Sequence, residues 1–248
     1  PQMGVVQTQL MIQKCLQYGI DFNGFLDKSY NSKKWEKWLK DNTSENKFLC
    51  SVIAGHYNFK EEEYKLIVNE INKNIDHENT IVTHDAGHPR DQMMPFITAT
   101  NPGSYIGWGK STHLGYGIPL MIGAKIAKPE KFCINFMGDG AFGMSGLDIE
   151  TSQRSGSPIT TIVMNNGTMG GYPQNYPQSI EKFQTIKMTG NYAKIAEGMG
   201  AKGISVDHPN EIKKAILDAR KFNDDGFSVL IDIKTQPELK MSNYSELL

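Results

Sequence analysis

Two short segments hold the residues of this sequence that are best suited to chemistry. Gly138–Ala141 (GDGA) and Asn165–Thr168 (NNGT) each follow an apolar run of about strand length. The first contributes the carboxylate of Asp139, and the second contributes the amide oxygen of Asn166 beside ordinary backbone carbonyls. These are hard oxygen ligands of the kind that Mg²⁺ prefers, and Mg²⁺ usually completes its octahedron with phosphate oxygens and water. The pair predicts a metal-bridged diphosphate site.

The glycines of the first segment favour a phosphate at the same place. Gly140 lets the backbone approach a phosphate closely, and the N–H groups of Gly140 and Ala141 are expected to face it at the N-terminus of a helix. Taken singly, Asp139 could be a helix N-cap and Asn166 a turn residue. Their joint placement one strand–helix–strand crossover apart favours the metal site.

The elements that position these segments alternate between strand and helix. We expect strands at 80–83, 132–137, 159–164, 202–206 and 228–233, and helices at 61–74, 114–127, 145–155, 192–199 and 209–222. Such alternation predicts an α/β fold, a parallel β-sheet with helices on both faces. The continuous apolar run 132–137 is typical of a strand buried on both faces. Ligands of such sheets bind at the loops that leave the carboxyl ends of the strands.

The GDG segment, followed one crossover later by NN, resembles the thiamine diphosphate (ThDP) motif of the acetohydroxyacid synthase, pyruvate oxidase and pyruvate decarboxylase superfamily. The resemblance implies the C-terminal diphosphate-binding (PP) domain of that superfamily, with ThDP and Mg²⁺ as cofactors. It makes Asp139 and Asn166 metal ligands, with the backbone carbonyl of Thr168 as a third. It also places Gly138 and Gly140, with Ala141, along the diphosphate.

The resemblance extends upstream to Leu114–Ala127 (LGYGIPLMIGAKIA), which is similar to a family segment beginning Met-Gly-Phe/Tyr-Gly-Leu-Pro. It implies that Leu114 stands where the family's Met bends the cofactor into its V shape. It also implies that the carbonyl of Thr112 accepts from the aminopyrimidine amine. His113 and Lys110 depart from the family's usual residues and bear on substrate preference. Leu114, Thr112 and His113 are therefore the expected catalytic residues.

Two further loops complete the expected cofactor site. Thr83–His88 (THDAGH) resembles the family's strand-end Asp-Val-Gly turn, and its polar residue His88 is expected to approach the diphosphate. After the NN pair, Met169 and Tyr172 occupy the loop that the family places near the reacting carbon.

A competing interpretation treats Gly138–Gly143 as the GxGxxG fingerprint of dinucleotide-binding folds. That fingerprint needs an acidic residue about 20 positions on, at the end of the next strand, to hold the ribose. The next strand ends in Asn165-Asn166 instead, and Asp148 and Glu150 fall within the intervening helix. Nicotinamide binding therefore remains a minor alternative.

Bulk properties exclude several other classes. The chain has 248 residues with 26 basic and 27 acidic side chains, a formal net charge of −1. That balance provides no electrostatic footprint for nucleic acid. Three scattered cysteines without a CxxC pair favour a reducing compartment, the cytoplasm or an organelle matrix. No apolar run approaches the roughly 20 residues of a membrane span.

We expect residues 1–58 to be the tail of a preceding domain plus a linker, with helix-like stretches at 8–18 and 33–40, and residues 59–248 to be the PP domain. The resemblance implies a second, pyrimidine-binding (PYR) domain that carries an activating Glu, and the region before residue 60 is too short for one. That domain is expected from another segment or chain in a homo- or hetero-oligomer. Either a fragment or a naturally split enzyme fits, and the missing initiator Met favours the fragment.

The expected function is ThDP- and Mg²⁺-dependent cleavage or formation of a C–C bond on a 2-oxo acid such as pyruvate. The enzyme would be a decarboxylase or an acetolactate synthase-like carboligase. One alternative is the ThDP-binding subunit of a 2-oxoacid:ferredoxin oxidoreductase, against which the scattered cysteines argue. Another is a non-catalytic ThDP-binding protein.

Overall fold

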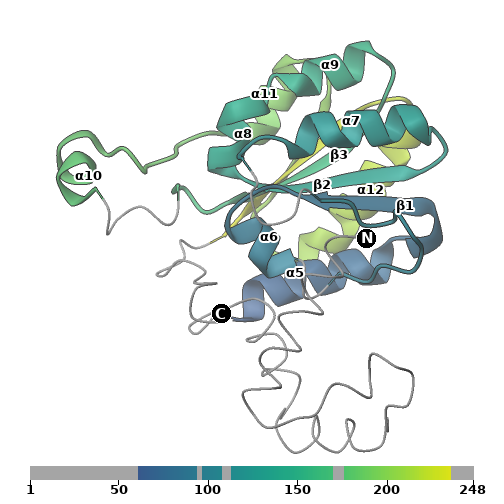
Figure 1. The fold of residues 1–248 in the computed structure, drawn as a ribbon, viewed down its shortest axis with the longest axis horizontal. Helices are drawn as coiled ribbons and strands as arrows, with labels where there is room; N and C mark the ends of the chain where they lie inside the picture. The colour runs from purple at the N-terminus through teal and green to yellow at the C-terminus, as the bar shows by residue number, and fades with distance from the viewer. Residues whose placement is uncertain (1–60, 94–96, 108–112, 170–175, 236–248) are drawn as a thin grey trace, which may run out of the picture. The chain divides into compact units, whose positions relative to one another are not determined.

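A parallel sheet of five strands forms the centre of the structure, in the order β1-β2-β3-β5-β4 (Figure 1). The strands are β1 (Thr80–His84), β2 (Phe132–Gly138), β3 (Thr160–Asn165), β4 (Lys202–Val206) and β5 (Val229–Lys234). This computed structural model describes residues 61–93, 97–107, 113–169 and 176–235. These residues belong to one unit, Phe59–Met241.

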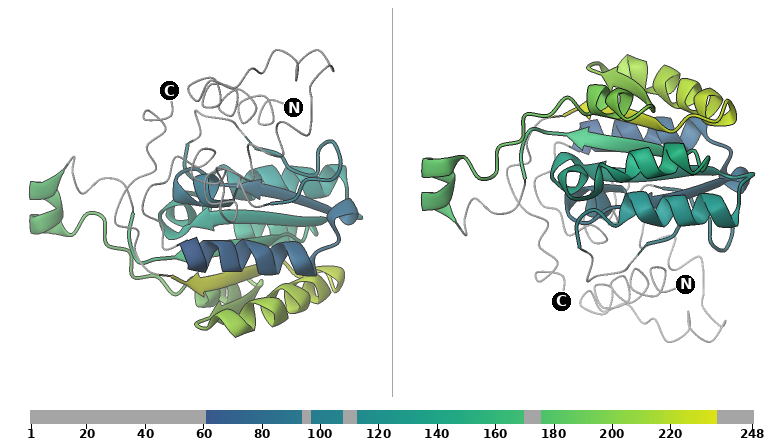
Figure 2. Two further views of the ribbon diagram at one scale, coloured as in Figure 1. Left: turned by 90° about the horizontal axis from the view of Figure 1, so that it is seen from below. Right: turned by 90° about the horizontal axis from the view of Figure 1, so that it is seen from above.

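Helices cover both faces of the sheet, as Figures 1 and 2 show. One face carries α5 (Glu61–Asn74), α6 (His88–Met93) and α12 (Ile212–Asp224), and the other carries α7 (Gly117–Ala127), α8 (Asp139–Ser145), α9 (Asp148–Arg154) and α11 (Tyr192–Gly198). Two short 3₁₀ turns, η2 (His77–Asn79) and η3 (Pro209–Glu211), precede β1 and α12. The predicted α/β fold is confirmed.

The apolar run of β2 is buried because its alternate side chains enter two different cores. Phe132, Ile134 and Phe136 join the cluster under α5 and α12, whereas Cys133 and Met137 join the cluster under α7 and α11. A strand covered on both faces needs apolar residues at every position, which explains why the sequence shows a continuous run there.

Three predicted helices differ from the structure at their ends. The helix expected from Leu114 begins at Gly117, because Gly115 has a φ of +92°, a left-handed conformation that ends helical geometry. The helix expected over 145–155 is α9, which begins at Asp148, and a separate short helix, α8, lies between β2 and it. The helix expected from Pro209 starts as the 3₁₀ turn η3, which is capped by His208, and continues to Asp224.

Two helices were not predicted at all, α6 and α10 (Pro177–Phe183). α10 has no buried residue, and Figure 1 shows it standing away from the sheet. A helix without a buried face lacks the apolar periodicity by which a sequence reveals a helix.

Several expectations concern parts of the chain that the structure does not describe. The helix-like stretches at 8–18 and 33–40 lie outside the described residues, as does the whole segment 1–58, so that domain assignment stays a prediction. Within the described part of the chain, no helix combines the length and the apolar character needed to cross a membrane.

Candidate cofactor and metal site

The GDG and NN segments lie side by side at the carboxyl edge of the sheet. β2 and β3 are hydrogen-bonded neighbours in parallel register, with Gly138 opposite Met164. The two following loops are joined directly, because the Gly167 N–H donates to Asp139 Oδ2 at 2.9 Å. The predicted juxtaposition of the two segments is therefore present in the structure.

Asp139 is the first residue of α8 and is only 2% exposed. Its Oδ1 accepts the N–H of Gly140 at 2.8 Å, so the amide that the sequence assigned to a phosphate has a partner within the chain. The hydrogen bonds from Gly140 and Gly167 fix the orientation of the carboxylate from two sides.

Asn166 is half-buried, and its side chain is turned into its own loop. Its Oδ1 accepts the N–H of Thr168 at 3.0 Å, which closes a tight Asx turn. Gly167 between them has a φ of +71°, a backbone conformation that glycine adopts without steric cost. The turn holds the amide oxygen of Asn166 and the backbone of Thr168 in one short loop.

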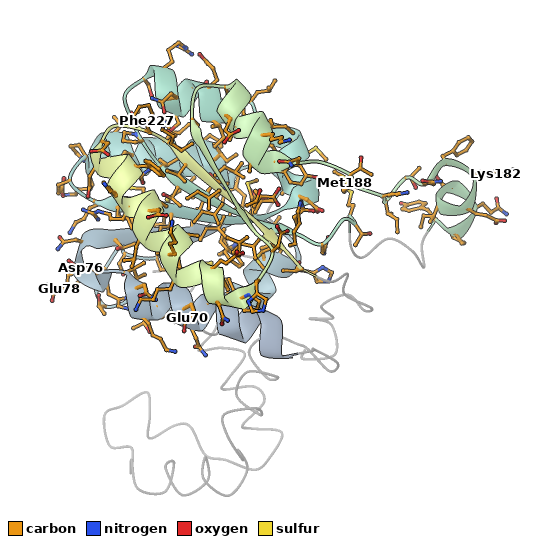
Figure 3. The ribbon with its side chains drawn as sticks, turned by 180° about the vertical axis from the view of Figure 1, so that it is seen from behind. Glu70, Asp76, Glu78, Lys182, Met188 and Phe227 are labelled. Carbon is orange, nitrogen blue, oxygen red and sulfur yellow. The ribbon has the colours of Figure 1, made fainter. Side chains whose placement is uncertain are left out.

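A second segment clamps this loop from the side of α10. The N–H of Met169 donates to the Ile186 carbonyl at 2.7 Å, and the N–H of Met188 donates to the Gly167 carbonyl at 2.9 Å. Thr168 and Lys187 form an antiparallel bridge between these bonds. Figure 3 shows Met188 between the sheet and α10, in the segment 186–188 that pairs with the NN loop. The chain that returns from α10 thus holds the NN loop in place, a contact that no sequence pattern predicted.

The predicted cofactor residue Met169 packs over the first turn of α8. A Cβ built on Gly140 would lie 3.1 Å from Met169 Cε, closer than side chains normally tolerate. Gly140 therefore admits the methionine against the GDG segment. Ala141 is buried in the core cluster under α7 and α11.

Asp85 is a structural carboxylate that the sequence interpretation missed. It is fully buried, and its Oδ1 accepts the N–H groups of Ala86 at 2.8 Å and Gly115 at 2.9 Å. Its Oδ2 accepts the N–H of Gly117 at 2.8 Å. Burial raises the pKa of the Asp85 carboxyl above its ordinary value, and the hydrogen bonds from Gly115 and Gly117 oppose that rise. Asp85 thus fastens the loop before α7 to the end of β1. An acidic residue directly after a strand was the available signal, but it suggested only a turn.

The loop that Asp85 holds carries two of the expected catalytic residues. Leu114 is partly buried and packs against the core cluster under α7 and α11. His113 is exposed, and the centroid of its ring lies 6.2 Å from that of Tyr116. Thr112 lies outside the described residues, as do Lys110 and Tyr172.

His88 begins α6 and is partly buried. The next residue, Pro89, would contact a Cβ built on Gly138 at 3.6 Å, so the start of α6 lies against the end of β2. This brings the third expected loop to the edge of the sheet that carries Asp139.

The donor set fits Mg²⁺ and a diphosphate. Among the described residues, no group of three or more His, Cys, Asp or Glu side chains could hold a metal ion by itself. The edge instead offers the carboxylate of Asp139, the amide oxygen of Asn166 and backbone carbonyls. Mg²⁺ is typically held by one or two carboxylates together with phosphates and water rather than by an all-protein cage. The arrangement can therefore fix a phosphate-bound cation, with the phosphates completing its coordination.

Comparison with known proteins identifies the family of this chain. Residues 85–233 match the family model "Thiamine pyrophosphate enzyme, C-terminal TPP binding domain". The acetolactate synthase large subunit of Buchnera aphidicola subsp. Schlechtendalia chinensis is 26% identical over 90% of this chain and 38% of the relative. The probable acetolactate synthase large subunit of Methanococcus aeolicus is 29% identical over 73% of this chain and 30% of the relative. The sulfoacetaldehyde acetyltransferase of Castellaniella defragrans is 30% identical over 75% of this chain and 32% of the relative. The chain spans about a third of the length of these curated relatives.

Proposed function

Since this chain belongs to the thiamine pyrophosphate enzymes by their C-terminal TPP-binding domain, we propose that it supplies the diphosphate and Mg²⁺ half of a ThDP-dependent active site. The reaction is the cleavage or formation of a C–C bond beside the carbonyl of a 2-oxo acid. When bound, ThDP supplies the electron sink for that chemistry, and the protein supplies binding, orientation and electrostatics.

Asp139, Asn166 and the carbonyl of Thr168 hold the Mg²⁺ in this proposal, and Gly138, Gly140 and Ala141 line the diphosphate. The observation that supports it best is the hydrogen bond from Gly167 to Asp139, which joins the two motif loops. That bond brings together the carboxylate of one loop and the oxygen donors of the other. A lone helix cap or a lone turn residue would need no such link.

The residues that precede α7 serve the other end of the cofactor. We assign Leu114 to the bend of the cofactor, and Thr112 and His113 to the pyrimidine side of the site. His88 borders the diphosphate from the loop after β1, and Met169 belongs to the loop that the family places near the reacting carbon. The remaining half of the site, with its activating Glu, comes from a PYR domain in another segment or another chain.

Pyruvate is the first 2-oxo acid to test. The relatives carry the names acetolactate synthase and sulfoacetaldehyde acetyltransferase, which favours a carboligase or an acyl transfer over simple decarboxylation. The ThDP-binding subunit of a 2-oxoacid:ferredoxin oxidoreductase remains the second candidate, to be separated by iron content and visible absorption.

The test replaces the carboxylate that the metal needs. Asp139→Ala is expected to lower Mg²⁺-dependent ThDP affinity by at least about 100-fold, since even partners of metal ligands typically cost roughly 10–100-fold. The circular dichroism spectrum should stay that of the parent. Affinity is measured by calorimetric titration with ThDP at saturating Mg²⁺.

Asp148→Ala is the matched control, because Asp148 also opens a short helix, α9, but lies outside the two motif loops. It should bind ThDP as the parent does. An Asp139→Ala protein whose affinity stays within a few-fold of the parent would refute the metal site.

A further inference from the structure

A buried polar link lies directly behind the loop that carries Asn166. Asp232, in the middle of β5, is fully buried and stands opposite Val163 of β3. Its Oδ1 accepts the side-chain N–H of Asn165 at 2.8 Å, and its Oδ2 accepts the backbone N–H of Tyr192 at 3.0 Å. One carboxylate therefore joins the end of β3 to the first residue of α11.

Asn165 spreads this link over three segments. Its Nδ2 donates also to the Gly190 carbonyl at 3.3 Å, in the stretch that leads into α11. Its backbone carbonyl accepts the N–H of Thr235 at 3.0 Å, just after β5. Asn165 is 7% exposed and immediately precedes Asn166. Hydrogen bonds to three segments therefore fix the last residue of β3 just before the predicted metal ligand.

This arrangement is costly for a strand interior, because a buried carboxylate loses its hydration. Lys234 compensates in part, with Nζ at 3.2 and 3.3 Å from the two oxygens of Asp232, but its side chain is 40% exposed. An apolar pair between β3 and β5 would avoid the desolvation. What the polar pair adds is direction, since its hydrogen bonds specify how the end of β3 is oriented.

We propose that Asp232 and Asn165 are positioning residues for the metal. Their hydrogen bond orients the end of β3 so that the oxygens of Asn166 and Thr168 are presented to the Mg²⁺ beside Asp139. The proposal rests on the proposed function. It assigns to residues that need not touch the cofactor the role of the outer-shell partners that orient metal ligands.

The other end of the same strand provides a matched control. Asn223, in α12, is also buried, at 5% exposure, and its side chain joins the start of β3 to neighbouring segments. Its Nδ2 donates to the carbonyls of Phe227 at 2.8 Å and Ile159 at 3.3 Å, and its Oδ1 accepts from Thr160 Oγ1 at 3.0 Å. Removing either asparagine breaks a buried hydrogen-bond set on β3, but only Asn165 adjoins the NN loop.

The experiment titrates Mg²⁺ into the full chain at fixed ThDP and records the Mg²⁺ concentration at half-saturation, together with the melting temperature. Asn165→Ala is expected to raise that concentration by roughly 10–100-fold. Asn223→Ala is expected to lower the melting temperature comparably and to leave the Mg²⁺ requirement within about twofold of the parent. Equal Mg²⁺ requirements in the two variants would overturn the positioning role and leave a purely structural one.

Asp232→Asn and Asp232→Ala extend the test if Asn165→Ala does not fold. The asparagine keeps one acceptor oxygen and the alanine keeps none, so the Mg²⁺ requirement should rise in the order parent, Asp232→Asn, Asp232→Ala. A folded Asp232→Asn protein and a folded Asp232→Ala protein that both match the parent would overturn the proposal. A parent chain that binds no ThDP at any Mg²⁺ concentration would instead refute the proposed function, so the two failures are distinguishable.

Discussion

Two buried carboxylates at the same edge of the sheet have different surroundings. Asp85 accepts three backbone N–H groups, from Ala86, Gly115 and Gly117, and so joins the loop before α7 to the end of β1. Asp139 accepts the N–H groups of Gly140 and Gly167, one from each of the two motif loops. Hydrogen bonds from both motif loops therefore orient the carboxylate of Asp139, as outer partners orient a metal ligand.

The environment of Asp85 predicts a pH dependence of stability. Its folded-state pKa is raised, mainly by burial, above the ordinary aspartate value of about 3.9. Between those two values the folded protein holds a proton that the unfolded chain has lost, so the contribution of Asp85 to stability falls as pH rises through the raised pKa. Asp85→Asn removes this titration.

The measurement is urea unfolding of the parent and of Asp85→Asn from pH 3.5 to 7. The free energy of unfolding of the parent, relative to the variant, should decline as pH rises from about 4. A difference that is constant with pH, or that grows in favour of the parent, would contradict the raised pKa.

At the scale of elements, the N-terminus of α7 packs closely enough on β2 to exclude any side chain. A Cβ on Gly117 would lie 2.2 Å from Asn135 Oδ1 and 3.0 Å from Asp85 Oδ2. Glycine at this position is therefore what lets α7 approach the sheet and bring the Leu114 turn to its carboxyl edge.

The same helix offers an internal comparison. Gly117→Ala is expected to destabilise the fold by about 1–3 kcal/mol through overpacking. Gly123→Ala, where a Cβ meets nothing within 4 Å, is expected to stabilise it by about 0.5–1 kcal/mol by removing a helix-interior glycine. Thermal and urea unfolding of both variants tests this, and the account of α7 packing would be wrong if the two changes had the same sign.

The sequence revealed those elements whose burial leaves a pattern. β2 and β4 were predicted to within one residue, because apolar runs between turns define strands with covered faces. α10 left no pattern, since none of its residues is buried. The extent of α8 was also missed, since the helix predicted over 145–155 shares only Ser145 with it.

The candidate site likewise has contacts that the sequence predicted and contacts that it did not. Residue type and spacing predicted that Asp139 would meet the NN loop, because neighbouring parallel strands end at one edge. The contacts by which Asp85, Asp232 and the segment 186–188 hold the site loops in place were not predictable. They join residues far apart in the sequence, and a buried Asp is indistinguishable from a surface Asp until its neighbours are known.

At the scale of the whole molecule, we propose that the sheet provides one half of a site. The GDG and NN loops, the α6 turn and the Leu114 turn all lie at the carboxyl edge of β1, β2 and β3, on one side of the diphosphate position that we propose. The chain spans about a third of the length of its curated relatives. In our proposal the PYR domain closes the opposite side, so this chain alone binds the cofactor without turnover.

Calorimetric titration of the full chain with ThDP, with and without Mg²⁺, and with NAD in parallel, tests the central claim most directly. We predict that ThDP binds only in the presence of Mg²⁺ and that NAD does not bind, because the glycine loop delivers a carboxylate that needs a cation between itself and a diphosphate. Binding of NAD, or binding of ThDP that is indifferent to Mg²⁺, would contradict the account of Asp139 and Asn166 as a metal-bridged diphosphate site.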